Sequence, residues 1–113
     1  MDEVHRQVLQ ENLTYLQDNL SLEDVLDKLY EARIISDDQL LRLHKETSKS
    51  PKSCVRELVV IILPKAGSTA FAEFIKALQA TQQMAYISNH LLSEVQKVQQ
   101  RLYEGNYHYS ARS

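Results

Sequence analysis

The sequence predicts an all-α protein, an antiparallel bundle of six helices in which the sixth helix is extended. Apolar residues recur at every third or fourth position along most of the chain, which is the spacing of one helix face. Serines typical of helix starts precede several of these stretches. The 113 residues include only two glycines and two prolines, which leaves little material for strands and hairpin turns. Short amphipathic helices with short connections favour a bundle.

The first three helices are expected from residue 3 up to a polar break at residues 47–50. The first runs from about Glu3 to Asn19. Ser21 is the expected N-cap of the second, with Asp24 as its capping-box partner, and Ser36 caps a short third helix with Gln39 in the same role. The expected inward-facing residues are Val4, Val8, Leu9, Leu13, Leu16, Leu20, Leu22, Val25, Leu26, Leu29, Tyr30, Leu40, Leu41 and Leu43.

The fourth helix has the clearest start signal, because Ser50 is followed by a proline at the first helical position. Its β-branched run, residues 59–62, would indicate a strand in isolation. We interpret the run as buried helix, since a helix start precedes it and no second strand is available to pair with it. Pro64 and Gly67 are expected to end this helix.

Ser68 is the expected cap of a fifth helix, whose inward-facing residues would include Phe71 and Phe74. The sixth helix is expected from about Gln83 to residue 104, because no helix breaker occurs before Gly105. Residues 1–92 would then form the bundle, residues 93–104 an extension of the last helix, and residues 105–113 a flexible tail. The extension either packs along the bundle or serves as a partner-binding or self-pairing segment.

Charge is distributed unevenly along the chain. The net charge of −2 argues against a general nucleic-acid binder. Residues 1–47 carry 11 acidic and 5 basic residues, whereas residues 48–113 carry 4 acidic and 8 basic residues. This asymmetry is either scatter over a solvated surface or a pair of opposite patches that can meet on two molecules.

The residue types needed for catalysis or metal binding are not arranged for either role. Cys54 and the four histidines, His5, His44, His90 and His108, are dispersed along the chain. No Cys-x-x-Cys and no pair of histidines four residues apart is present, so we expect no catalytic residue, metal site, cofactor or small-molecule substrate. No apolar stretch suits a membrane span or a secretory signal, and one cysteine suits a reducing cytoplasmic location.

Residues 63–78, LPKAGSTAFAEFIKAL, resemble the passage between the fourth and fifth helices of caspase recruitment domains (CARDs), which belong to the death fold. In the prodomains of initiator caspases and in the RAIDD adaptor, an L-P-x-x-G connection likewise leads into an A-F-x-x-F-x-x-x-L helix. The segment from Leu22 to Leu29, the triplet Ile34-Ile35-Ser36 and the opening Met1-Asp2-Glu3 are also similar. The resemblance covers roughly residues 3–92 and implies a six-helix death fold.

The resemblance also implies two docking faces, because CARDs assemble when an acidic face of one molecule meets a basic face of the next. The implied acidic face, on the second and third helices, consists of Glu23, Asp24, Asp27, Glu31, Asp37 and Asp38. The implied basic face, on the first and fourth helices, consists of Arg6, Lys49, Lys52 and Arg56. The first helix departs from the family pattern, with Gln10, Glu11 and Leu13 where some caspase prodomains carry arginines.

By this resemblance the chain is expected to be a non-catalytic CARD–CARD interaction module in apoptotic or inflammatory signalling. It would recruit or regulate an initiator caspase or an adaptor, as a caspase prodomain or as a CARD-only regulator. Its partners would be other CARD-containing proteins, with self-association as a further expectation. The alternative is a structural helical-assembly protein that oligomerises through its last helix, residues 84–104.

Overall fold

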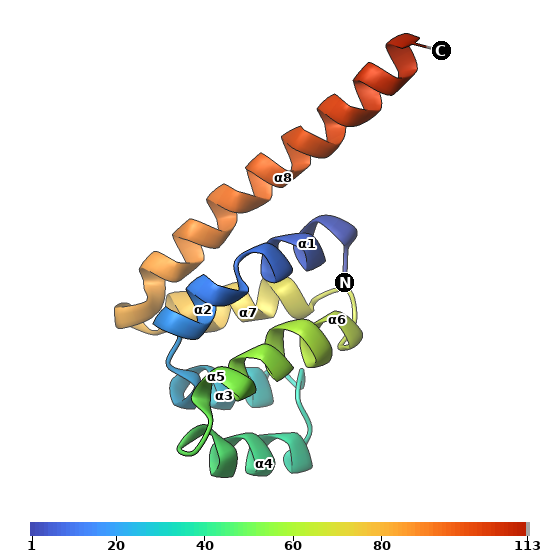
Figure 1. The fold of residues 1–113 in the computed structure, drawn as a ribbon. Helices are drawn as coiled ribbons and strands as arrows, with labels where there is room; N and C mark the ends of the chain where they lie inside the picture. The colour runs from blue at the N-terminus through green and yellow to red at the C-terminus, as the bar shows by residue number, and fades with distance from the viewer. Residues whose placement is uncertain (113) are drawn as a thin grey trace.

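The computed structural model describes the backbone of residues 1–112 and the side chains of residues 1–104. All regular structure in the described backbone is helical, and the helices pack as the predicted six-part bundle (Figure 1). The all-α six-helix prediction is therefore confirmed. The elements are α1 (Glu3–Glu11), α2 (Leu13–Asn19), α3 (Leu22–Glu31), α4 (Asp37–Thr47), α5 (Pro51–Arg56), η1 (Glu57–Ile62), α6 (Leu63–Lys65), α7 (Ala70–Ala80), η2 (Gln82–Met84) and α8 (Ala85–Arg112).

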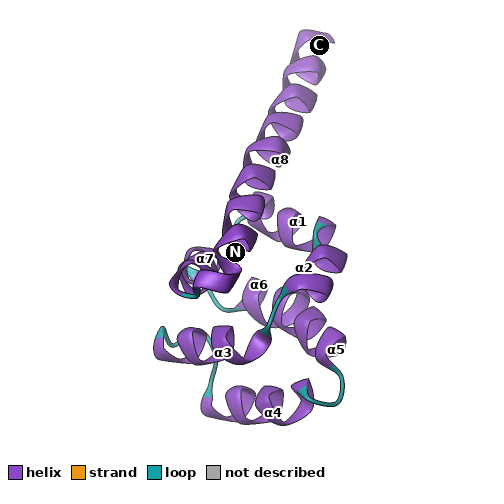
Figure 2. Ribbon diagram, turned by 90° about the vertical axis from the view of Figure 1, so that its left-hand side faces the viewer, coloured by secondary structure: helices purple, strands orange, loops and turns teal. Residues whose placement is uncertain are grey.

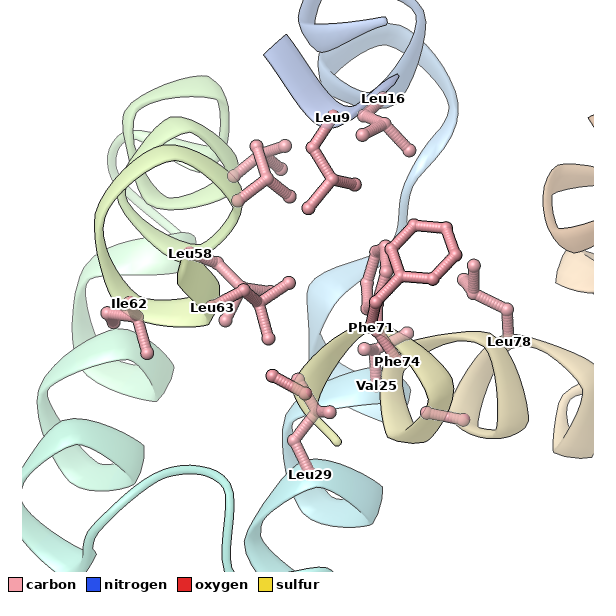
Figure 3. Packing of buried hydrophobic residues seen from close by; sticks show 14 of the residues in the cluster. Leu9, Leu16, Val25, Leu29, Leu58, Ile62, Leu63, Phe71, Phe74 and Leu78 are labelled. Carbon is pink, nitrogen blue, oxygen red and sulfur yellow. The ribbon is translucent and has the colours of Figure 1, made fainter. Parts of the chain in front are cut away.

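The core takes in side chains from all six helical parts, including Leu43 of α4 and Ile87, Leu91 and Val98 of α8, and Figure 3 shows some of these buried residues close up. Phe71 and Phe74 of α7 point toward Val25 of α3 and toward the leucines of α1, α2 and the fourth helix. Phe74 is fully buried, as are Leu9, Leu16, Leu29, Leu58, Leu63 and Leu78. These residues fall on the predicted apolar faces, so their burial holds the amphipathic helices together.

The predicted first helix is divided at Asn12 into α1 and α2. Asn12 is buried, and its side-chain amide donates to the carbonyl oxygen of Val8 at 2.9 Å. The expectation of one uninterrupted helix is therefore wrong. Asparagine side chains bond to nearby backbone groups in place of the regular helical pattern, and this competition gives a physical reason for the break.

The fourth helix is continuous from Pro51 to Lys65, through α5, η1 and α6. Its β-branched run is helical, as predicted, and lies in a π-helical segment. Pro64 does not end the helix, because the wider π turn before it leaves room for a ring that would clash in a regular α-helix. The chain reverses instead at Gly67, whose φ of 106° is open to glycine and strained for other residues.

The serine caps are only partly as predicted. Ser36 forms the full capping box with Gln39, whereas Ser21 and Ser50 occupy N-cap positions without a side-chain hydrogen bond. The N-cap of α7 is Thr69 and not Ser68. The sequence pattern indicates where a helix begins, but the rotamer of the hydroxyl depends on the local chain path.

Two residues expected to face inward are exposed. Tyr30 is 40% exposed, because its hydroxyl reaches out to donate to the carboxylate of Asp37. Leu41 is 69% exposed, since Leu43, which is buried, and Leu40 cover the inner side of α4, which contacts α3 and α5.

Helix α8 packs on α1 and α7 and then projects beyond the bundle (Figures 1 and 2). It does not end at Gly105, because one glycine costs only about 1 kcal/mol relative to alanine within a helix. The backbone of the predicted tail is thus helical to Arg112, while its flexibility stays a prediction and Ser113 lies outside the described residues. None of the described helices combines the length and the apolar character needed to cross a membrane.

Candidate protein-interaction faces

An acidic strip runs along the outer side of α3. It consists of Glu23, Asp24, Asp27 and Glu31, all of which are exposed. Asp24, Asp27 and Glu31 follow one another at intervals of three and four residues, so they lie on one side of the helix. The remaining residues of the implied acidic face, Asp37 and Asp38, are exposed in the first turn of the neighbouring helix α4.

Two surface hollows adjoin this strip. Asp24, Asp27 and Glu31 line the first hollow together with the connection from α7 to α8, residues 80–83. Glu31 also lines the second hollow, together with Asp37. The structure therefore brings four of the six predicted acidic residues around two adjoining hollows, while Glu23 and Asp38 lie on the same helices outside them.

Two polar partners hold carboxylates of this face in place. His44 of α4 lies with its Nε2 3.0 Å from Oδ1 of Asp27, and this contact joins α4 to α3. The hydroxyl of Tyr30 donates to Asp37, and this hydrogen bond raises the pKa of the tyrosine. Neither partner is predicted from the sequence, because Asp27 and His44 are 17 residues apart and Tyr30 and Asp37 lie on different helices.

A basic strip lies at the start of the fourth helix. It consists of Lys49, Lys52 and Arg56, exposed and spaced three and four residues apart. Lys49 and Arg56 form no salt bridge with any residue whose side chain is described. The Nζ of Lys52 lies 3.6 Å from Oδ1 of Asp18, an α2 residue that belongs to neither predicted face.

Arg6 does not join the basic strip directly. It lies on α1, which packs on η1 and α8, whereas Lys52 lies beside α2, where Gln17 donates to its backbone carbonyl. The guanidinium of Arg6 is 3.8 Å from Glu3 of its own helix. Lys52 and Arg56 therefore lie one helical turn apart on α5 and Lys49 lies just before this helix, whereas Arg6 occupies a separate helix.

Cys54 and the described histidines each lie in different surroundings. Cys54 is buried, and this burial raises the pKa of its thiol, which disfavours the nucleophilic thiolate. His5 stacks on Phe71, and His90 stacks on Tyr15, each with 4.1 Å between ring centroids. Among the described residues no group of three metal-ligating side chains occurs, and the side chain of His108 lies outside them.

The family comparison covers most of the chain. A family model described as the caspase recruitment domain matches residues 6–92. The match includes the acidic and basic strips and ends within α8. Comparisons with curated proteins and with solved structures give no match.

Proposed function

Because this chain belongs to the caspase recruitment domain family, we propose that it recruits or regulates an initiator caspase or a caspase adaptor. Domains of this family are homotypic protein-interaction modules of apoptotic and inflammatory signalling, and they are generally non-catalytic. In our proposal the chain acts either as the prodomain of a caspase or as a CARD-only protein that competes for the same contacts. The buried free thiol of Cys54 suits a reducing cytosolic location, which is part of this proposal.

One observation supports this proposal most directly: strips of opposite charge lie on different elements of one molecule. The acidic strip follows α3, and the basic strip follows the beginning of the fourth helix. A contact between two different surfaces is heterologous, so repeated docking leads to a ring or a helical assembly. Charge complementarity of this kind sets partner choice and encounter rate.

Each such contact should be weak and sensitive to salt. Individual exposed ion pairs contribute only about 0–1 kcal/mol, and salt screens them. Recruitment would then depend on several contacts that act together. We therefore assign docking to two whole surfaces and not to any single ion pair. One surface is the basic strip, and the other is the acidic face, which consists of Glu23, Asp24, Asp27, Glu31, Asp37 and Asp38.

The proposal is tested by affinity capture from cell lysate with wild-type protein and with the Asp27→Arg variant, followed by mass spectrometry. Glu104→Arg, on the exposed end of α8, makes the same charge change away from both strips. We expect CARD-containing proteins to bind the wild type and Glu104→Arg but not Asp27→Arg. Capture of the same CARD proteins by Asp27→Arg would place docking on another face, and capture of none would contradict the proposed recruitment.

The alternative, assembly through the last helix, has less support. Its apolar stripe includes Leu91 and Val98, and both side chains are buried within the chain's own core. Among the side chains that the structure describes, Leu102 at the end of that stripe is 37% exposed. Oligomerisation that survives Asp27→Arg combined with Arg56→Glu, and is lost when α8 is shortened, would favour the alternative.

A further inference from the structure

Each of the two strips contains or adjoins residues of opposite charge; on the acidic side these include Arg33, which lines the second hollow with Glu31 and Asp37. Lys28 lies on α3 among the acidic residues and lines the same hollow as Asp24, Asp27 and Glu31. Asp18 lies beside the basic strip, next to Lys52. If the strips served only to maximise opposite charge, Lys28 and Asp18 would both weaken the contact between them.

Lys28 is exposed and available to a partner. It forms no salt bridge with any of the side chains described, residues 1–104, although Asp24 and Glu31 lie one helical turn to either side. Its ammonium group therefore stands as a positive point within a negative surface. An all-basic partner surface would meet repulsion at this point.

Asp18 is a negative residue beside the basic strip. Its side chain is 55% exposed, that of Lys52 is 70% exposed, and their charged atoms are 3.6 Å apart. Such an exposed pair is weakly held, so Asp18 can exchange partners on docking. The hydrogen bond of 3.0 Å from Gln17 to the carbonyl of Lys52 fixes α2 against α5, which keeps Asp18 at the edge of the basic strip.

The two exceptions, Asp18 and Lys28, carry opposite charges and can therefore pair with each other. We propose that these faces fit a second copy of this chain, in a contact that places Asp18 of one copy opposite Lys28 of the next. The inference rests on the proposed docking of acidic against basic strips, and it adds the partner and the register. A partner with a uniformly acidic surface would be repelled by Asp18, so the pair selects for self-association.

The test is a charge-swap cycle read by sedimentation velocity at low and physiological salt. We compare the wild type with Asp18→Lys, Lys28→Asp and the double variant. Each single swap should weaken self-association about threefold or more, and the double variant should recover it to within about twofold. An equimolar mixture of the two single variants should recover dimers, because the unaltered Asp18 of the Lys28→Asp variant can then meet the unaltered Lys28 of the Asp18→Lys variant.

If Asp18 has no partner in the contact, its replacement should strengthen self-association and not weaken it. If Asp18 only dilutes the basic strip, Asp18→Lys and the milder Asp18→Asn should strengthen self-association whatever residue stands at position 28. That result, or a double variant as weak as the single ones, would overturn the inference. Thermal melting of each variant, together with Lys28→Gln as a milder change, separates loss of docking from loss of folding.

The outcomes also separate this inference from the proposed function. Absence of self-association in the wild type overturns the inference, whereas binding of another CARD that is lost in Asp27→Arg would still support the proposed function. Self-association that is unaffected by Asp27→Arg would contradict docking through the acidic face and, with it, the register inferred from it. Glu104→Lys and Lys97→Asp, both on α8, serve as matched charge controls and should leave self-association unchanged.

Discussion

Arg101 of α8 donates hydrogen bonds to both carboxylate oxygens of Glu11 in α1, at 2.8 and 2.9 Å. The two residues are 90 positions apart in the sequence, and Arg101 lies beyond the matched family segment. Closer to the start of α8, His90 lies 3.0 Å from the side chain of Asn12. Contacts between α8 and the first helix therefore extend from residue 90 to residue 101, so part of the extension belongs to the folded domain.

Truncation after Leu92 should consequently destabilise the fold. It removes Val98, which is 2% exposed, and the partly buried Val95, and it uncovers part of α1. Burial of one valine side chain contributes about 2 kcal/mol, so the free energy of unfolding should fall by at least that amount. The melting temperature should fall by roughly 8 °C or more, which calorimetry measures directly.

Truncation after Glu104 is the matched control for this experiment. It keeps Val95, Val98 and the contact of Arg101 with Glu11 and removes only the segment that the sequence predicts to be a flexible tail, so the free energy of unfolding should change by less than about 0.5 kcal/mol. A chain shortened after Leu92 that melts like the full-length protein would show that residues 93–104 are an appendage, contrary to the burial of Val98.

The ion pair between Arg42 and Glu57 gives a prediction for acidic pH. The guanidinium of Arg42 donates to both carboxylate oxygens of Glu57, and these hydrogen bonds hold the pKa of Glu57 below its usual value, although partial burial opposes this. A carboxyl whose pKa is lower in the folded state stabilises the fold above its unfolded pKa of about 4.3. That stabilisation is lost as the pH falls through the lower, folded-state pKa.

Urea unfolding of the wild type and of Glu57→Gln, at pH 7, 4 and 2.5, checks this expectation. The wild type should be more stable at pH 7 by on the order of 1 kcal/mol, because the pair is partly shielded from solvent. The difference between the two proteins should shrink as the pH falls through the lowered pKa of Glu57, because the carboxylate then takes up a proton. An unchanged difference across the series would mean that Glu57 contributes through its shape and not through its charge.

Local sequence patterns predict the helices and the acidic strip, but they do not predict contacts between residues that are far apart in the sequence. The all-helical fold and the acidic strip follow from spacings of three and four residues, which bring Asp24, Asp27 and Glu31 together whatever the rest of the chain does. Pairs such as Asp18 with Lys52 depend on how α2 packs on α5, and spacing within one helix contains no information about that.

The break at Asn12 and the left-handed conformation of Arg33 were missed for a related reason. Neither residue is a usual breaker of helices, and each conformation depends on neighbouring groups. Asn12 is held by its contacts with Val8 and His90. The bond to Val8 is local, whereas the contact with His90 joins residues 78 positions apart and forms only after the helices have assembled, and a pattern of apolar residues predicts neither.

Ser21 and Ser36 allow a paired test, because both occupy the N-cap position of a helix but only Ser36 forms a side-chain capping hydrogen bond. The hydroxyl oxygen of Ser36 accepts from the backbone N–H of Gln39 at 3.2 Å, and the Gln39 side chain accepts from the backbone N–H of Ser36 at 2.9 Å. Ser36→Ala should therefore cost about 1 kcal/mol. Ser21→Ala should cost only a few tenths of that, because Ser21 makes no side-chain cap bond. Equal losses in urea unfolding of the two variants would show that Ser21 caps α3 in solution.

Replacement of Arg33 by glycine should stabilise the protein. The backbone N–H of Ile34 donates to Leu29 and that of Arg33 to Tyr30, each at 2.9 Å, which is the hydrogen-bond pattern of a Schellman motif at the end of α3. This motif holds Arg33 at a φ of 62°, a left-handed conformation that costs a side-chain-bearing residue about 1–2 kcal/mol. Glycine avoids this strain but loses more conformational entropy on folding, so Arg33→Gly should gain about 0.5–1 kcal/mol in urea unfolding. Arg33→Ala keeps the strain while removing the charge, and a gain of the same size in that variant would attribute the effect to charge and not to backbone conformation.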